Sequence, residues 1–383
     1  MRQNTLIHAA LFLCLLLAGC RGDLPFIPSE EEDVPGAGET STRIRGLYVL
    51  NEGNMGSNKA SLDYFSYETG TYLRNIYPTR NPGIVKELGD VGNDLAVYGD
   101  KLYAVINCSH YVEVMDVRTA RHVGSVDILN CRYITFDQGK AYVSSYAGPV
   151  QIDPNARPGK VVEVDTASLQ ITREVVVGYQ PEEMVVCDGR LYVANSGGYR
   201  FPDYDTTVSV IDLETFQVIR TIDVAINLHR MVKDRYGRIY VSSRGDYYDQ
   251  GADVYVIDSR TDRVVGNLGV PASELCLSGD SLYMTSVEWN YTTGSNAVSY
   301  TLYDVAREEV VSRQFITDGT DKRIQIPYGL AVNPETKEIF VTDAKDYVTP
   351  GTLYCFTPAG ELKWEVTTGD IPAHLAFTTE RLE

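Results

Sequence analysis

The sequence predicts an all-β protein, a seven-bladed β-propeller whose ring is closed by a C-terminal strand joining blade one. Three observations carry this prediction. A strand in which an aromatic residue is flanked by apolar residues recurs seven times, at intervals of 39 to 57 residues, which is a spacing typical of propellers. The residues around each copy follow one four-strand pattern. The last residues of the chain repeat the beginning of a blade. The recurring aromatic residues are Tyr48, Tyr103, Tyr142, Tyr192, Tyr240, Tyr283 and Phe340.

Each repeat contains four predicted strands. An apolar strand such as residues 183–186 comes first, and a turn with glycine, such as Asp188-Gly189, follows it. Glycine adopts the positive φ that two-residue hairpins need. The aromatic strand, a variable loop, a strand ending in aspartate (residues 208–212) and an amphipathic strand (residues 217–222) complete the unit. A pair of β-sandwiches is the alternative, and it explains the repeat length badly.

The predicted ring closure rests on the two ends of the chain. Blade one begins near Arg43 without a first strand, whereas residues 372–377 match the blade openings at 181–186 and 327–332. We therefore expect the C-terminus to supply the missing strand and remove the free edge. The aspartates that end the third strands are predicted to cap turns through backbone N–H groups rather than to bind calcium. They are Asp116, Asp165, Asp212, Asp258 and Asp304.

The N-terminal residues predict export. Residues 6–17 are apolar apart from His8, too short a run to span a bilayer, so residues 1–19 are predicted to be a signal peptide. The ending Leu-Ala-Gly-Cys is similar to a bacterial lipobox, which implies cleavage before Cys20 and lipidation of its thiol; an ordinary secretory signal is the alternative. Residues 20–45 are predicted to be an acidic flexible tether and residues 46–383 the propeller.

The net charge and the N-terminal residues predict which partners are disfavoured and where the protein is located. The net charge of −18 disfavours nucleic acids and anionic lipids as partners. We expect an outer-membrane lipoprotein held only by its lipid anchor and facing the cell exterior, because acidic residues after the lipidated cysteine resemble a surface-export signal. Retention in the periplasm stays open.

One face of the predicted ring has much longer loops than the other, at residues 51–59, 145–160, 195–207, 244–253, 288–296 and 344–349. Long loops on one face of a rigid scaffold favour a binding site there. The predicted ligand-binding residues on these loops are Tyr146, Tyr199, Phe201, Arg244, Tyr247, Tyr248, Trp289 and Tyr291. Those at the channel mouth, at or beside the first strands, are Asp94, Arg132, Tyr133, Glu183, Arg230, Glu274, Tyr328 and His374.

Catalysis is not expected. The sequence contains no nucleophile elbow, phosphate-binding loop or zinc-protease motif. Asn93, Asp94 and Glu183 could hold a divalent cation as in lactonase-type propellers, and such a hydrolase is the alternative. Cys108 and Cys131 are both predicted near the long-loop face and are candidates for a disulfide, which export would permit.

The opening Gly-Leu-Tyr-Val-Leu-Asn-Glu-Gly-Asn at residues 46–54, followed by Ala-Ser-Leu-Asp-Tyr at residues 60–64, resembles YncE-like propeller lipoproteins of Bacteroidetes. Within that group the chain is similar to BtuG-type surface proteins, which bind vitamin B12 and pass it to a BtuB-like TonB-dependent transporter of the outer membrane. The resemblance implies capture of cobalamin or a related corrinoid, with no cofactor. No motif is specific for cobalamin, so no ligand residue follows from the resemblance. An adhesin that binds glycan or protein is a further alternative.

Overall fold

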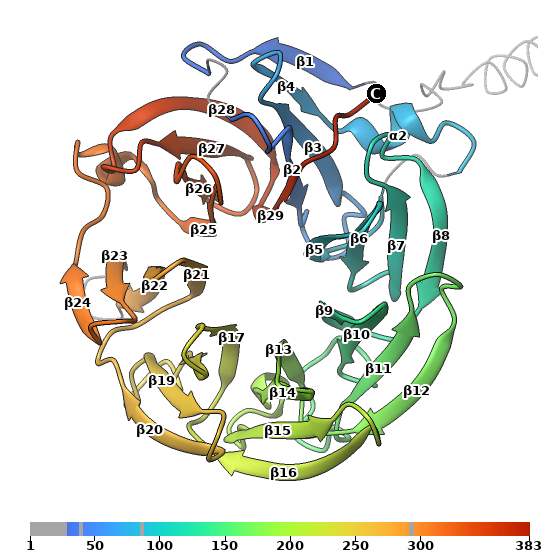
Figure 1. Ribbon diagram of the computed structural model, residues 1–383, viewed down its shortest axis with the longest axis vertical. Coiled ribbons are helices and arrows are strands. Elements are labelled where there is room, and N and C mark those ends of the chain that lie inside the picture. The colour runs from blue at the N-terminus through green and yellow to red at the C-terminus, as the bar shows by residue number, and fades with distance from the viewer. Residues whose placement is uncertain (1–28, 38–40, 85–87, 291–294) are drawn as a thin grey trace, which may run out of the picture.

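The computed structural model describes residues 29–37, 41–84, 88–290 and 295–383. The predicted signal peptide, Cys20 and Tyr291 lie outside the described residues. Seven antiparallel sheets surround a central channel in Figure 1, one for each predicted blade. The seven-bladed propeller predicted from the repeats is therefore confirmed.

Each blade from the second to the seventh has four strands, ordered from the channel outwards as in the chain. Blades two to four are β5 (Gly92–Tyr98), β6 (Lys101–Ile106), β7 (Tyr111–Asp116), β8 (His122–Asp127); β9 (Cys131–Asp137), β10 (Lys140–Ser145), β11 (Lys160–Asp165), β12 (Ile171–Val176); and β13 (Pro181–Cys187), β14 (Arg190–Asn195), β15 (Thr207–Asp212), β16 (Gln217–Asp223). Blades five to seven are β17 (Leu228–Lys233), β18 (Arg238–Ser243), β19 (Asp253–Asp258), β20 (Arg263–Asn267); β21 (Glu274–Ser278), β22 (Ser281–Asn290), β23 (Ser295–Asp304), β24 (Glu309–Ser312); and β25 (Pro327–Val332), β26 (Ile339–Asp343), β27 (Pro350–Phe356), β28 (Leu362–Asp370).

Blade one joins both ends of the chain. Its order is β29 (Pro372–Thr378), β2 (Gly46–Asn51), β3 (Ser61–Ser66), β4 (Thr71–Arg74) and β1 (Glu30–Asp33), with β29 innermost. The register places Val49 opposite Leu375 and Leu47 opposite Phe377. The predicted closure by the C-terminal strand is confirmed.

The acidic segment before the propeller differs from the prediction. Residues 30–33, expected in a flexible tether, form β1 and pair with β4 on the outer edge of blade one. Val34 is buried, and the Glu335 carboxylate accepts hydrogen bonds from Ser41 and Thr42. The prediction of a flexible tether was wrong for residues 30–33, because the backbone edge of β4 offers pairing that acidic side chains do not prevent.

The core lies between neighbouring blades, where apolar side chains of the middle strands meet. The recurrent tyrosines place their rings there and their hydroxyls further out. Tyr48 donates to the carbonyl of Val117 at 2.7 Å, and Tyr192 donates to that of Ser259 at 3.1 Å, each in the next blade. In these two blades the tyrosine therefore both fills the core and binds the neighbouring turn.

The turns follow the prediction as well. The Asp116 carboxylate accepts from the N–H groups of Arg118 and Thr119, and Asp212 accepts from that of Thr215. Asp165, Asp258 and Asp304 bind nearby backbone N–H groups in the same way.

Three short helices complete the secondary structure of the described residues: α2 (Ile76–Arg80), η1 (Gly198–Arg200) and η2 (Thr320–Arg323). No helix among the described residues is long and apolar enough to cross a membrane.

Candidate binding site

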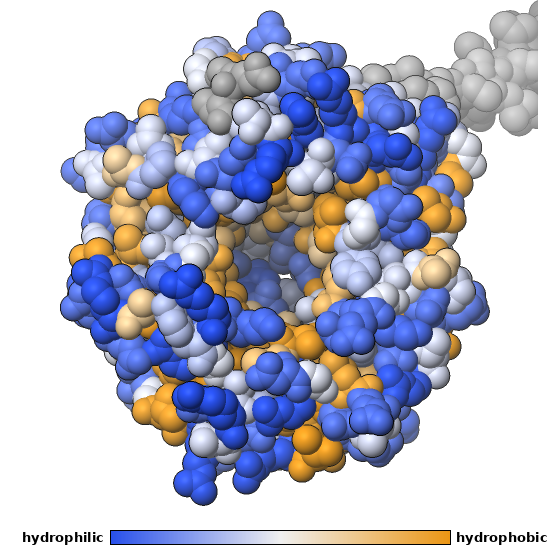
Figure 2. Space-filling model, viewed as in Figure 1, coloured by the Kyte–Doolittle hydropathy of each residue, from blue (hydrophilic) through white to orange (hydrophobic). Residues whose placement is uncertain are grey.

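The main cavity of the molecule opens at the mouth of the central channel, on the face with the long loops. Its volume is about 750 Å³, and residues from all seven blades line it. Figure 2 shows the hollow at the centre of the ring, with hydrophobic patches around it. A cavity of this size suits a bulky small molecule rather than an ion.

Four aromatic side chains form an exposed rim around this cavity. The side chains of Tyr247, Tyr248 and Trp289 are 56%, 70% and 53% exposed, and that of Tyr347 is 39% exposed. Trp289 does not lie in a loop as predicted, because β22 and β23 extend as a long hairpin in which Trp289 pairs with Asn296. The sheet therefore positions this ring on regular backbone.

Ten of the sixteen predicted ligand-binding residues line the main cavity: Arg132, Tyr133, Tyr199, Arg230, Arg244, Tyr247, Tyr248, Glu274, Trp289 and Tyr328. Five others lie elsewhere, and Tyr291 is outside the described residues. Tyr146 is buried, and Phe201 is exposed away from the cavity. Asp94, Glu183 and His374 do not line the cavity but lie close to it: Glu183 is 4.0 Å from the lining residue Arg230, His374 is 3.9 Å from the lining residue Glu52, and Asp94 is 3.7 Å from His374.

Sequence reasoning missed several lining residues, among them Glu52 and His229, and it named Asn93 only as a candidate metal ligand. Each could have been found from its position. Glu52 lies in the Asn-Glu-Gly segment at residues 51–53, which is part of the family-like opening. Asn93 directly precedes Asp94, and His229 directly precedes Arg230, and both of the following residues were predicted. A bulge near the start of the first strand brings two consecutive residues to the channel mouth in most blades, as in the pairing of β17 with β18; β21 pairs with β22 without one.

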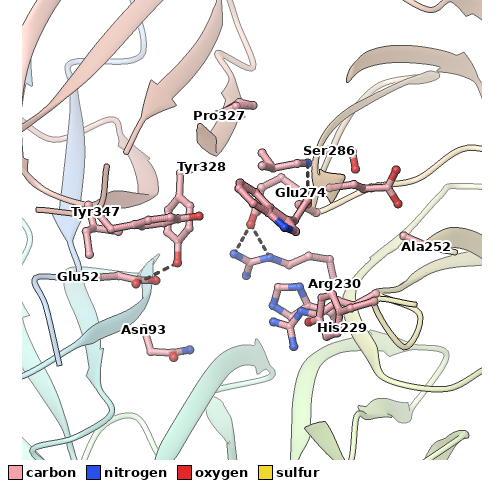
Figure 3. A pocket seen from close by; sticks show the side chains of 18 of the residues that line it. Glu52, Asn93, His229, Arg230, Ala252, Glu274, Ser286, Pro327, Tyr328 and Tyr347 are labelled. Carbon is pink, nitrogen blue, oxygen red and sulfur yellow. Dashed lines mark hydrogen bonds and ion pairs between the residues drawn. The ribbon is translucent and has the colours of Figure 1, made fainter. Parts of the chain in front are cut away.

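Arginine–carboxylate pairs form the floor of the cavity. Arg230 binds Glu274 with its Nε at 2.9 Å and a terminal nitrogen at 2.6 Å, as Figure 3 shows. Arg132 and Arg244 share the buried carboxylate of Glu182, at 3.3 and 3.5 Å. Positive and negative groups therefore alternate, and the floor offers both hydrogen-bond donors and acceptors.

Two histidines at the floor are uncharged at neutral pH. The Tyr133 hydroxyl lies 2.8 Å from Nε2 of His229. Burial, reinforced by the surrounding arginines, holds the pKa of His229 well below its ordinary range, and burial acts likewise on His374. His374 lies 3.7 Å from Asp94 and 3.9 Å from Glu52. Two neutral imidazoles, that of His229 in the cavity lining and that of His374 beside it, therefore lie near charged arginines.

Three carboxyl groups near the floor are easier to protonate than usual. Burial raises the pKa of Glu183 to about 8, that of Glu52 to about 7 and that of Asp94 to about 6. Hydrogen bonds oppose this effect: Tyr328 donates to Glu52 at 3.0 Å (Figure 3), and the N–H of Met231 donates to Glu183 at 2.6 Å. The charge of the floor therefore changes between pH 6 and 8.

Glu183 should make the stability of the fold depend on pH. Its pKa is raised on folding from 4.5 to about 8, so its contribution is complete below about pH 4.5 and is lost as the pH rises through 8. We expect the free energy of unfolding to fall between pH 5 and 9 by a few kcal/mol more in the wild type than in Glu183→Gln, since one pKa unit corresponds to about 1.4 kcal/mol. Urea denaturation at several pH values measures this, and parallel curves for both proteins would contradict it.

Two of the three residues proposed for the alternative metal site, Asp94 and Glu183, accept hydrogen bonds from backbone N–H groups. Asp94 accepts from the N–H groups of Leu95 and Ile134 at 2.8 Å, and the amide of Asn93 donates to the carbonyl of Arg132 at 2.7 Å. Across the described ranges, no group of three His, Cys, Asp or Glu side chains is arranged to hold a metal ion. Asp94 and Glu183 thus connect neighbouring first strands.

The predicted disulfide between Cys108 and Cys131 is not present in the structure. Both cysteines are free. Cys131 begins β9 with its side chain buried in the core between blades two and three, whereas Cys108 lines the main cavity. Position near the same face was insufficient, because Cys108 lies in the turn after β6 and faces the cavity, whereas Cys131 is fixed by β9 in the core.

Comparison with known proteins places the chain in a family. A family model described as "Domain of unknown function (DUF5074)" matches residues 45–369, which is the propeller almost from end to end. The chain belongs to the DUF5074 family. No curated protein matches the sequence of this DUF5074 protein.

Solved structures share the fold of the DUF5074 domain at low sequence identity. A hypothetical selenium-binding protein from Sulfolobus tokodaii is 11% identical with a TM-score of 0.61, over 89% of this chain and 95% of that one. A quinonprotein alcohol dehydrogenase-like protein from Bacteroides thetaiotaomicron is 14% identical with a TM-score of 0.59, over 88% and 79%. Kuenenia stuttgartiensis hydrazine synthase is 18% identical with a TM-score of 0.55, over 69% and 76%. These likenesses concern the β-propeller fold alone.

Proposed function

We propose that this DUF5074 protein captures cobalamin or a related corrinoid in the main cavity and delivers it unchanged to an outer-membrane TonB-dependent transporter. The observation that carries the proposal is the exposed aromatic rim above a floor of balanced charge. The resemblance to BtuG-type proteins supplies the ligand class and the transporter. The protein would be held at the membrane by the lipid on Cys20, facing the exterior.

The chemistry of the ligand matches the cavity. A corrin ring is large, partly apolar and fringed with amides, so aromatic faces can cover its apolar parts. Its amides can donate to carboxylates such as Glu274 and accept from guanidinium groups such as Arg244. A ligand of low net charge also meets no strong repulsion from a floor where arginines and carboxylates alternate.

The rim can supply enough binding energy. Burial of about 100 Å² of ligand against each of four rings would contribute on the order of 10 kcal/mol at about 25 cal/mol per Å². Association itself costs roughly 4–15 kcal/mol. Tight binding therefore requires that the rings be ordered in advance, and the extended β22–β23 hairpin does this for Trp289.

Isothermal titration with cyanocobalamin tests the proposal. We expect wild-type protein to bind, and the variant Tyr247→Ala/Tyr248→Ala/Trp289→Ala to bind at least 100-fold more weakly because it loses three of the four rim rings. Its melting temperature should stay close to that of the wild type, since these side chains are exposed.

Tyr236→Ala is the matched control. Tyr236 is 41% exposed in the turn between β17 and β18, at the opposite end of β18 from Tyr247. The Tyr236→Ala variant should bind cyanocobalamin with the affinity of the wild type. Absence of measurable heat with folded wild-type protein at micromolar concentration would contradict the proposal.

A further inference from the structure

A second cavity, of about 370 Å³, lies beside the main one and is formed largely by the loop between β10 and β11. Its walls are mostly apolar. They include Leu129, Tyr146, Ala147, Pro149 and Ala156, and Gln180 contributes the buried polar group. A cavity of this volume suits one or two small rings.

The two cavities are separated by a thin wall. Tyr146 lines the smaller cavity and Tyr199 lines the larger, and their ring centroids are 5.5 Å apart at an interplanar angle of 89°. The Tyr146 hydroxyl donates to Glu182 at 2.5 Å, and the Arg132 guanidinium lies 4.8 Å from the centroid of the Tyr146 ring. The wall thus consists of two rings, and Glu182 and Arg132 fix the position of the Tyr146 ring.

Gln180 departs from the equivalent residues of the neighbouring blades. One residue with a positive φ directly precedes the first strand in each of blades three, four and five: Asn130, Gln180 and Asn227. The backbone carbonyl of each accepts a hydrogen bond from the N–H of the residue that follows the second strand of the same blade. The amides of Asn130 and Asn227 then donate to the carbonyls of Gly148 and Gly245 at 2.9 and 3.0 Å, which fastens the loop.

Gln180 instead lines the smaller cavity. Its side chain is one methylene longer, its residue is 2% exposed, and its Oε1 has no hydrogen-bond partner. A buried acceptor without a donor is costly unless something else satisfies it. The cavity therefore combines apolar walls with the polar side chains of Gln151, Asp153, Asn155 and Arg157. Its buried acceptor, Oε1 of Gln180, is the group that an O–H or N–H group of a ligand would satisfy.

We propose that the smaller cavity holds a small, mostly apolar cyclic appendage with a hydroxyl or N–H donor, carried by the same ligand whose bulk fills the main cavity. This inference rests on the proposed function. For a corrinoid the appendage is the base and ribose of the nucleotide, with the flat base against the apolar walls and a ribose hydroxyl donating to Gln180; the phosphodiester would remain outside the smaller cavity. Because only the rings of Tyr146 and Tyr199 separate the cavities, a ligand in the main cavity would have to pass over the edge of this wall to place the appendage in the smaller one.

Titration with two corrinoids tests this. Cyanocobalamin carries the nucleotide and dicyanocobinamide lacks it. We expect wild-type protein to bind cyanocobalamin at least 10-fold more tightly. Ala156→Phe, which fills the smaller cavity, should remove this preference by weakening cyanocobalamin binding alone. Gln180→Asn, which restores the side chain of the neighbouring blades, should reduce the preference several-fold.

Ile152→Phe is the matched control, because Ile152 is 72% exposed on the same loop and does not line the smaller cavity. It should keep the wild-type preference. Equal affinity of the wild type for both corrinoids, or equal weakening of both by Ala156→Phe, would overturn the inference while leaving corrinoid capture intact. If Ala156→Phe does not fold, an unchanged preference in Gln180→Asn overturns it. Failure of both corrinoids to bind contradicts the proposed function as well.

Discussion

A chain that ends at Asp370, without β29, is expected not to form a stable closed ring. The deletion removes the strand that pairs with β2 over its whole length and leaves the edge of Leu47, Tyr48 and Val49 unpaired. The same deletion uncovers the inner faces of blades two and seven, which contact β29. Folded domains are stable by only about 5–15 kcal/mol, so losing an entire inner strand should exceed this margin.

Thermal denaturation followed by circular dichroism, together with limited proteolysis, measures the effect. The matched control is a chain that begins at Val34 and so lacks β1, the outermost strand of the same sheet, whose side chains are mostly exposed. We expect this control to melt within a few degrees of the full-length protein. A cooperative transition near the full-length melting temperature in the chain that lacks β29 would show that the ring does not depend on closure.

Glu182→Ala is expected to have the second largest effect. The Glu182 side chain is buried and binds Arg132, Arg244 and the Tyr146 hydroxyl. Burial alone would raise the pKa of Glu182, but the two arginines reverse this and lower it, so the carboxylate is charged. Removing it leaves two guanidinium groups without a counter-charge, which typically costs about 3–5 kcal/mol.

Urea denaturation measures this cost. Glu174→Ala is the matched control, because Glu174 pairs with Lys160 at 2.8 Å on the surface and should contribute less than about 1 kcal/mol. We also expect Glu182→Ala to weaken cyanocobalamin binding, since Arg132 and Arg244 line the main cavity and lose their fixed positions. A cost for Glu182→Ala as small as that for Glu174→Ala would show that the cavity floor does not depend on this carboxylate.

The fold was predictable because its signals are local and repeated. Each blade carries its own turn glycine, aromatic strand and capping aspartate, and the backbone bonds at Asp116 and Asp212 are those the pattern predicts. The site was predictable only in part. Loop position identified Tyr247 and Tyr248, which are exposed at the cavity, but it also identified Tyr146, which is buried.

The sequence alone determined the number of blades, the closing strand and the face on which the main cavity opens, because these follow from spacing along the chain. Only the tertiary structure decided which rings are exposed, where β1 pairs and which partner each buried charge takes. Glu182, for example, binds arginines 50 and 62 residues away. Such contacts join different blades, and their geometry depends on how neighbouring sheets pack, which no local pattern records.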